Sequence, residues 1–284
     1  MHGLGNDYIY IDCTATPPPE NIKDLAIEMS RRHTSIGSDG IILITASDTC
    51  DFGMRIFNAD GSEAKMCGNG ARCVGKYVFD HGLTNKKSIT LETLSGVRIL
   101  TLNVSDYDKK VNEVTVDMGK PELRPKFIPA LFDDNLLLDK PISTTLGNIH
   151  ITAVSMGNPH GVIFLDDDID DIDIQTIGPE LECHPLWPDR ANIEFINIVN
   201  PDTIRMRVWE RGSGETMACG TGACASAVAF LLKTNRMNSF NKPITVMLKG
   251  GNLKIAVNQI NGHILMTGPA TESFRGTYDY VQDK

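Results

Sequence analysis

The chain has few positive charges and lacks a long hydrophobic run. Its 27 Lys and Arg residues are outnumbered by 36 Asp and Glu residues, which gives a net charge of −9 at pH 7. Nucleic acids and anionic membrane surfaces attract basic patches, so this balance argues against both as partners. The longest apolar run, residues 225–232, is far shorter than the roughly 20 residues that a membrane-spanning helix needs.

The cysteines cannot all be paired with one another, because their number is odd. Seven occur, at positions 13, 50, 67, 73, 183, 219 and 224, and the first residues show neither the basic nor the apolar segment of a secretory signal. This pattern favours reduced thiols in a cytoplasmic protein over a disulfide framework. The apolar content of 41% and the charged content of 22% are typical of a soluble globular protein, and 284 residues allow two domains.

The chain contains one sequence pattern twice. Residues 54–71 align without a gap with residues 206–223, at an offset of 152 positions that places Cys67 opposite Cys219. Weaker matches at offsets of 155 and 149 positions extend the similarity through most of each half. Repeated sequence usually means repeated supersecondary structure, so we expect two copies of one α/β unit.

The order of the predicted elements indicates the fold class. The helix after Gly222 is apolar on nearly every face and must be surrounded by other elements. Strands follow one another without alternating helices, which disfavours a doubly wound parallel sheet. We therefore predict an α/β protein of the α+β type. Two pseudo-symmetric domains, from an internal duplication, each have a curved or barrel-like, mostly antiparallel sheet around a central helix.

The elements and domains have the following predicted bounds. We expect an N-terminal half at residues 1–120, with the tail (about 266–284) as a candidate to pack back on it, and a C-terminal half at residues 121–265. Strands are predicted at residues 8–12, 40–45, 52–57, 88–92 and 97–104, and again at 148–155, 162–165, 194–199, 203–210, 243–248 and 253–257. Helices are predicted at residues 20–32, from the turn at 67–70 to near Gly82, and at 222–233, with a turn and short helix at 166–176.

Cys67 and Cys219 each precede a Gly-x-Gly-Ala segment that leads into a helix. The free N–H groups and the positive dipole end at such a place lower the pKa of a thiol and bind a carboxylate. If both helices point at one cleft, a thiolate and a thiol flank one α-carbon. One removes the α-proton and the other returns a proton on the opposite face, which inverts the centre. The backbone donors for the carboxylate are Gly68, Asn69, Gly220 and Thr221.

Other uses of these cysteines remain open. Either one can be a small packed residue at a helix start, and Cys73 and Cys224, further inside their helices, are expected to be core thiols. Zinc binding by these four cysteines is disfavoured, because their spacings of six and five residues differ from the short gaps of zinc knuckles. A disulfide between Cys67 and Cys219 is expected only as an oxidised, inactive form. No metal is therefore predicted.

Removal of a weakly acidic α-proton often relies on pyridoxal phosphate as an electron sink. The sequence shows no motif that commits a lysine to that group, so we predict no cofactor. A cofactor-free site needs a carboxylate neutralised by dipoles and a centre closed to water.

Several motifs resemble those of diaminopimelate epimerases, and the resemblance covers essentially the whole chain. It implies a pyridoxal-independent enzyme that interconverts LL- and meso-diaminopimelate, in lysine and peptidoglycan-precursor synthesis. It also implies two pseudo-symmetric α/β domains with the site between them, a small amino acid as substrate, and a possible homodimer. The motifs are the opening 1–7, the block 58–63, the two cysteine segments 66–73 and 218–224, the stretch 156–160, and Trp209-Glu210-Arg211-Gly212.

The resemblance assigns roles to individual residues. Cys67 and Cys219 are the base and acid, the turns Gly68-Asn69 and Gly220-Thr221 bind the reacting carboxylate, and Asn6 lines that end. Asn58, Asn158, Asn192 and Arg211 hold the distal carboxylate, Glu210 and Asn58 hold the distal ammonium, and His160 and Glu210 tune the thiols. Each also has a plainer interpretation: turn-stabilising asparagines, a loop histidine, and a surface ion pair between Glu210 and Arg211.

The chain departs from that family at two places. Family members begin a few residues earlier, so we expect the first half to lack an edge strand or to have a late start. Some members also carry Gln at the position of Gly40. The rival functions are a proline or hydroxyproline racemase, which tends to carry His where this chain has Asn69, and a binding protein that has lost catalysis, which needs neither cysteine.

Overall fold

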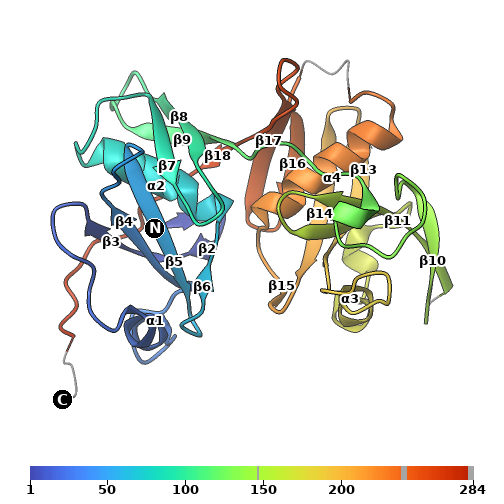
Figure 1. Ribbon diagram of the computed structural model, residues 1–284, viewed down its shortest axis with the longest axis horizontal. Helices are drawn as coiled ribbons and strands as arrows, with labels where there is room; N and C mark the ends of the chain where they lie inside the picture. The colour runs from blue at the N-terminus through green and yellow to red at the C-terminus, as the bar shows by residue number, and fades with distance from the viewer. Residues whose placement is uncertain (146, 238–241, 281–284) are drawn as a thin grey trace. The chain divides into compact units, whose positions relative to one another are not determined.

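The computed structural model describes residues 1–145, 147–237 and 242–280, and the chain divides into two compact units. Unit 1 comprises Met1–Val116 and Gly268–Lys284, and unit 2 comprises Asp117–Thr267 (Figure 1). Unit 2 is therefore an insertion within unit 1. None of the helices in the described ranges has both the length and the apolar character that crossing a membrane demands.

Unit 1 contains one main sheet and two helices. The strand order is β3-β4-β5-β7-β8-β9, with β6 paired to β5, and only β3–β4 and β5–β7 are parallel among these described pairs. The elements are β1 (His2–Gly3), β2 (Asn6–Asp7), β3 (Ile9–Cys13), α1 (Ile22–Ser30), β4 (Gly40–Thr45), β5 (Phe52–Asn58), β6 (Glu63–Ala64), α2 (Gly68–Asp80), β7 (Ser88–Glu92), β8 (Arg98–Val104) and β9 (Val111–Asp117).

Unit 2 repeats this plan, with α3 in the place of α1 and α4 in the place of α2, and adds the strands β10 and β11. Its strand order is β10-β11-β12-β13-β14-β16-β17-β18, with β15 paired to β14. The elements are η1 (Pro125–Phe127), β10 (Lys140–Thr144), β11 (Gly147–Ser155), β12 (Pro159–Phe164), η2 (Ile169–Asp171), α3 (Ile174–Glu182), β13 (Asn192–Asn200), β14 (Thr203–Glu210), β15 (Gly214–Glu215), α4 (Gly220–Lys233), β16 (Ile244–Leu248), β17 (Gly251–Val257) and β18 (Ile264–Pro269).

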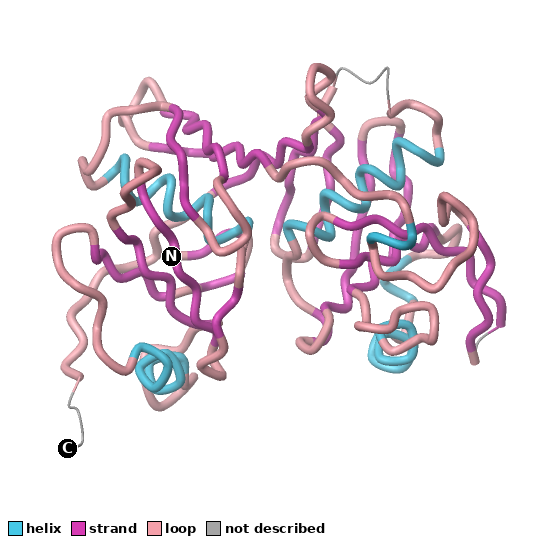
Figure 2. Tube along the Cα trace, in the orientation of Figure 1, coloured by secondary structure: helices cyan, strands magenta, loops and turns pink. Residues whose placement is uncertain are grey.

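The helix after each cysteine packs on strands of its own unit (Figure 2). Helix α4 contacts strands β11 to β14, β16 and β17, and its side chains are buried from Gly222 to Leu231. A helix without a polar face is stable only in such surroundings. In unit 1, a Cβ on Gly75 of α2 would lie 2.9 Å from Leu102 of β8, so glycine allows the helix to approach the sheet closely.

The pairing registers of the two units match at the offset seen in the sequence. The parallel pair Ile9↔Ile41 of unit 1 corresponds to Gly161↔Ile193 of unit 2. An ion pair also recurs: Arg55 Nε lies 2.8 Å from Glu63, as Arg207 Nε does from Glu215. The predicted duplication and fold class are confirmed.

Two parts of the chain differ from the sequence prediction. Helix α3 runs to Glu182, beyond the short helix predicted to end at residue 176, although Gly178 and Pro179 are helix breakers. Gly178 is required there because a Cβ would lie 2.5 Å from the indole of Trp209, so tertiary packing overrides propensity. The strands β9, β10 and β18 were also not predicted.

The segment that follows residue 268 packs on the beginning of the chain. His2 and Thr271 exchange two backbone hydrogen bonds of 2.9 and 3.0 Å. Arg72 Nε donates to Pro269 O over 3.0 Å. His81 Nε2 lies 2.9 Å from Glu272 Oε2. Unit 1 is therefore completed by the last described residues.

Candidate functional site

Cys67 and Cys219 are the N-caps of α2 and α4. Both have extended backbones, and each sulfur accepts a hydrogen bond of 3.3 Å from the third residue on, Gly70 N or Gly222 N. The helices predicted after the two cysteines are confirmed, but they begin at Gly68 and Gly220, earlier than the predicted starts after the turn at 67–70 and at Gly222. Gly68, Asn69, Gly220 and Thr221 form the first helical turns, where N–H groups lack intrahelical acceptors.

Asn6 contacts the sulfur of the first half-site, which we define as Cys67 with Asn6, Tyr8, Ile42 and Asn58. Cys67 Sγ donates to Asn6 Oδ1 over 3.4 Å, and Asn6 Nδ2 donates to Asp39 Oδ2 over 2.7 Å. Arg32 holds Asp39 with a 3.0 Å ion pair. Asp39 thus orients the amide so that its oxygen faces the thiol.

The remaining members of the first half-site are a phenol, an amide and an aliphatic side chain. Tyr8 Oη donates to Asn58 Oδ1 over 3.3 Å, and Asn58 Nδ2 donates to Ser62 Oγ over 3.1 Å. Ile42 is fully buried. A Cβ on Gly70 would lie 2.5 Å from Ile42 Cδ1, so an aliphatic side chain lies directly behind the first turn of α2.

The second half-site, defined as Cys219 with Asn158, His160, Glu194 and Glu210, contains a continuous polar chain. Glu194 Oε1 lies 2.7 Å from His160 Nδ1, and His160 Nε2 lies 3.0 Å from Asn158 Oδ1. Asn158 Nδ2 donates to Thr221 Oγ1 over 3.4 Å, which is 3.5 Å from Cys219 Sγ. His160 and Glu194 are fully buried, so His160 is not a loop histidine.

Glu210 is the second carboxylate beside Cys219. Its Oε1 accepts a 2.5 Å hydrogen bond from Thr216 Oγ1, and the nearby Cys219 thiol lowers the pKa of its carboxyl. Burial raises the pKa of Glu210, and the charge of Glu194 adds to this, against the lowering by Thr216 and Cys219. Glu210 is therefore engaged inside the half-site and not in a surface ion pair.

The ionisation of Cys219 differs from the sequence prediction. Burial raises the pKa of Cys219 well above its ordinary value, and the carboxylates of Glu210 and Glu194 raise it further. The hydrogen bonds from Thr221 and Gly222 N lower the pKa but do not outweigh these effects. The prediction that a helix N-terminus lowers the pKa of this thiol was wrong, because it left out desolvation and two nearby carboxylates.

Arg211 and Asn192 lie together in unit 2. Asn192 is buried, its Nδ2 donates to Pro159 O over 3.0 Å, and its Oδ1 accepts from Arg211 N over 3.0 Å. The Arg211 side chain is exposed and donates to Asp189 O over 3.0 Å. Asn192 therefore binds backbone groups here, as in the turn-stabilising alternative.

Sequence reasoning missed three residues with roles in these arrangements. Glu194 and Asp39 are described above. Glu182, at the end of α3, accepts from Trp209 Nε1 over 2.8 Å and from Gly212 N over 3.0 Å, which fixes both sides of Glu210 and Arg211. A charged residue inside the apolar strand sequence Asn-Ile-Glu-Phe-Ile-Asn was the available signal for Glu194.

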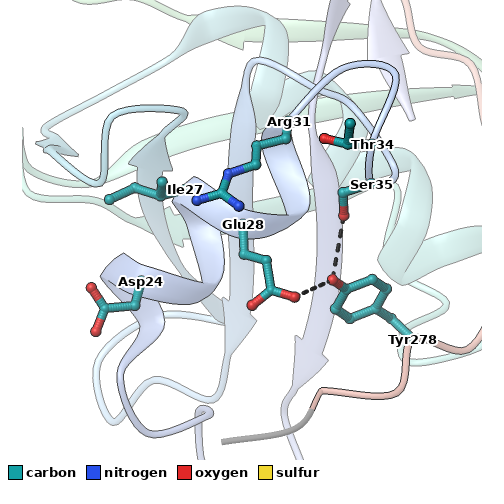
Figure 3. Close-up of a pocket in the computed structure, with 7 residues that line it drawn as sticks. All are labelled: Asp24, Ile27, Glu28, Arg31, Thr34, Ser35 and Tyr278. Carbon is teal, nitrogen blue, oxygen red and sulfur yellow. Dashed lines mark hydrogen bonds between the residues drawn. The ribbon is translucent and has the colours of Figure 1, made fainter. Parts of the chain in front are cut away.

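Cys73 and Cys224 are fully buried, which confirms that they are core thiols. A separate surface pocket of about 620 Å³ lies on α1 of unit 1, and none of the residues predicted for the site lines it (Figure 3). In this pocket Tyr278 Oη donates to Glu28 Oε1 over 2.5 Å. The pocket is lined by Asp24, Ile27, Glu28, Arg31, Thr34, Ser35 and Tyr278.

Comparisons with known proteins agree along the whole chain. A family model described as diaminopimelate epimerase matches residues 1–124 and 152–272. A diaminopimelate epimerase from Acetivibrio thermocellus is 49% identical over 279 residues, which are 98% of this chain and 97% of that protein. One from Bacteroides thetaiotaomicron is 54% identical over 276 residues, 97% of this chain and 95% of that protein.

A solved structure shares the fold at much lower identity. It is a probable proline racemase from Agrobacterium radiobacter K84 with bound carbonate, which matches with a TM-score of 0.66 and 16% identity over 94% of this chain and 88% of that chain. At this identity the likeness concerns the fold alone, so it does not separate the rival amino-acid racemases.

Proposed function

Because the chain belongs to the diaminopimelate epimerase family, we propose that it interconverts LL- and meso-diaminopimelate by inverting one α-carbon with two thiols. This reaction would supply lysine and peptidoglycan-precursor synthesis. The observation that carries the proposal is the repeated cap: Cys67 and Cys219 occupy equivalent positions and accept the same hydrogen bond from Gly70 and Gly222.

The two thiols would share the proton transfer. One cysteine, as a thiolate, removes the α-proton, and the other, as a thiol, gives a proton to the opposite face of the carbon. The substrate carboxylate would bind the first-turn N–H groups of Gly68, Asn69, Gly220 and Thr221, whose dipoles stabilise the charge that develops on it.

The raised pKa of Cys219 favours a protonated thiol in the ligand-free enzyme. A protonated thiol is ready to act as the proton donor. For the reverse direction Cys219 must lose its proton, and Glu210, whose carboxyl interacts with the thiol, would accept it. The transfer converts thiol and carboxylate into thiolate and carboxylic acid without changing the net charge. The raised pKa of Glu210 makes this exchange less unfavourable.

The distal end of the substrate would be held by complementary charge. The exposed Arg211 guanidinium suits a carboxylate, and Glu210 with Asn58 suits an ammonium. Asn158 would add a donor there, and Asn6 would line the reacting end beside Cys67. We assign Asn192 an indirect part, because its amide holds the backbone N–H of Arg211.

The test is incubation of the purified protein with LL-diaminopimelate in D₂O, without added cofactor. We expect deuterium to enter the α-carbon that is inverted, together with formation of the meso isomer. The distal centre should keep its hydrogen. Inversion of L-proline at a comparable rate, with none of diaminopimelate, would instead support the proline racemase alternative.

Matched cysteine variants complete the test. Cys67→Ala and Cys219→Ala should each abolish inversion, whereas Cys183→Ser, at an exposed cysteine outside both half-sites, should retain it. Circular dichroism of each variant verifies the fold. Near-normal turnover in either half-site variant would overturn the two-thiol proposal.

A further inference from the structure

Glu194 is the most unusual buried group of unit 2. It is fully buried as the third residue of β13, and its Oε1 lies 2.7 Å from His160 Nδ1. Its Oε2 is buried and has no hydrogen-bond partner among the described residues. Burying a carboxylate oxygen in this way costs free energy, so the residue needs an explanation beyond stability.

The equivalent residue of unit 1 shows that the fold does not require a carboxylate here. Ile42 precedes Glu194 by the same 152 positions that separate the two capping cysteines. A Cβ on Gly70 would meet Ile42 Cδ1 at 2.5 Å, and one on Gly222 would meet Glu194 Oε1 at 2.6 Å. The same place behind the first helical turn thus holds an apolar group in one unit and a carboxylate in the other.

The directions of the hydrogen bonds link Glu194 to the thiol. With Asn158 Nδ2 donating to Thr221 Oγ1, Asn158 Oδ1 must accept from His160 Nε2. A proton then lies between His160 Nδ1 and Glu194 Oε1. Because a histidine ring without a fixed partner can rotate or change tautomer, Glu194 determines which ring nitrogen faces Asn158.

We propose that Glu194 is a positioning residue of the second half-site: it holds His160 by Nδ1, so that His160, Asn158 and Thr221 remain aligned on the thiol of Cys219. Glu194 also places a buried negative charge behind that thiol. In the first half-site Ile42 occupies the equivalent position, and it can neither hold a histidine ring nor supply a charge. The inference rests on the proposed function in one respect, which is that Cys219 is a reacting group.

The other charged and titratable groups around β13 are distributed over its two faces. Ile193 and Phe195 pack in the cluster that includes α3, so Glu194 points to the opposite face, toward α4. On that face lie His160 of β12, Glu210 of β14 and Cys219 at the start of α4, with Cys224 one turn further on. On the α3 side, Arg207 pairs with Glu215, and Glu182 accepts from Trp209.

Two substitutions separate the two effects of Glu194. Glu194→Gln removes the charge but keeps a hydrogen-bonding amide for His160 Nδ1. Glu194→Ile removes both and copies the residue that the same backbone carries in unit 1. Glu215→Gln is the control, since it neutralises a carboxylate of unit 2 that pairs with Arg207 and Lys249 outside the polar chain.

NMR of the ligand-free protein provides readouts that do not depend on turnover. The ¹⁵N signals of His160 report which ring nitrogen carries hydrogen. The ¹³Cβ signal of Cys219, assigned with Cys219→Ser, reports the pH at which the thiol ionises. We expect Nε2 of His160 to carry hydrogen in the wild type, where Nδ1 shares a proton with Glu194, and in Glu194→Gln, and we expect a mixture of tautomers in Glu194→Ile.

The midpoint of the Cys219 titration should fall in both Glu194 variants and remain unchanged in Glu215→Gln. The corresponding limb of the pH profile of kcat/KM for LL-diaminopimelate should move in the same direction. An unchanged Cys219 midpoint in Glu194→Gln, or an unchanged His160 tautomer in a folded Glu194→Ile, would overturn the inference. A wild-type protein that shows these NMR properties but does not invert diaminopimelate would refute the proposed function instead.

Discussion

The two half-sites have the same backbone but different chemistry. Each has a cysteine that caps a helix with a 3.3 Å bond to a glycine N–H and an asparagine at the equivalent strand end. They differ at three positions related by the 152-residue offset, where unit 1 has a phenol, an aliphatic chain and an amide, and unit 2 has an imidazole and two carboxylates. The pairs are Tyr8 and His160, Ile42 and Glu194, and Asn58 and Glu210.

The comparison separates two contributions to the site: the backbone geometry that positions each thiol, and the neighbouring charges that affect its ionisation. Duplication gave each unit a thiol at a helix N-terminus, and substitution behind that thiol set its ionisation. Cys219 is surrounded by groups that raise its pKa and can take its proton. Cys67 instead faces the amide oxygen of Asn6. Equivalent positions therefore do not imply equivalent surroundings.

The largest expected effect comes from removing one thiol or both. Cys67→Ala and Cys219→Ala should each lower kcat by at least about 10³-fold, because each removes one end of the proton transfer. The double variant should be hardly worse, since groups that act as one unit give non-additive losses. Steady-state kinetics measure this. Losses that multiply in the double variant would mean that the half-sites work independently.

The recurring ion pair should stabilise the two units unequally. The Arg207 and Glu215 side chains are 11% and 13% exposed, and Arg207 also donates to the carbonyls of Ile169 and Ile172. Arg207→Ala should therefore lower the free energy of unfolding by about 3 kcal/mol, because it removes three hydrogen bonds, one to Glu215, which keeps Lys249, and two to the carbonyls.

The matching pair of unit 1 provides the control for that measurement. Arg55 and Glu63 are 46% and 25% exposed, and a solvated pair contributes less than about 1 kcal/mol. Chemical denaturation of Arg55→Ala should thus show a small change. Equal losses in the two variants would show that burial does not distinguish the pairs.

A smaller difference in the free energy of unfolding is expected when the glycine three residues after each cysteine is replaced. The Cβ of Gly70→Ala would clash with the end of the Ile42 side chain, which can change rotamer. This substitution should therefore lower the free energy of unfolding by about 1 kcal/mol. Gly222→Ala would press on Glu194 Oε1, which is held by His160, and on Cys219 Sγ at 3.2 Å. Its cost should be about 2–3 kcal/mol, as for overpacked cores. Unfolding curves decide, and a larger loss for Gly70→Ala would contradict this account.

The smallest effect concerns the segment that closes unit 1 and has no counterpart in unit 2. Tyr278 Oη donates to Glu28 Oε1 over 2.5 Å and accepts from Ser35 Oγ over 3.3 Å (Figure 3). Tyr278→Phe should cost about 1 kcal/mol, the usual net value of such hydrogen bonds. Tyr107→Phe, at a 98% exposed side chain, serves as the control in the same thermal melts.

Much of the fold could be predicted because its signals are local. The Gly-x-Gly-Ala segments predict the starts of α2 and α4, and the apolar faces predict their burial. Gly82 was predicted to end α2, and it lies just after the helix with φ of 75°. Helix α3 was predicted too short, because the packing of Gly178 on Trp209 depends on residues remote in sequence.

The site was predictable in its members but not in its electrostatics. Motifs selected Cys67, Cys219, His160 and Glu210. The pKa of Cys219 depends on burial and on Glu194, which becomes its neighbour only through pairing of β12, β13 and β14. Residue types and spacing do not contain that information.

The insertion of unit 2 within unit 1 affects the order of events during synthesis. The first strand pairs with β2 close by, but the bridge from His2 to Thr271 cannot form until nearly the whole chain has been translated. At about 5–20 residues per second, that wait is on the order of tens of seconds. Residues 117–267, by contrast, are contiguous and can fold while the ribosome is still at work. The first part of the chain to be made is therefore the last to be finished, and it depends on chaperones or on its own partial structure in the meantime.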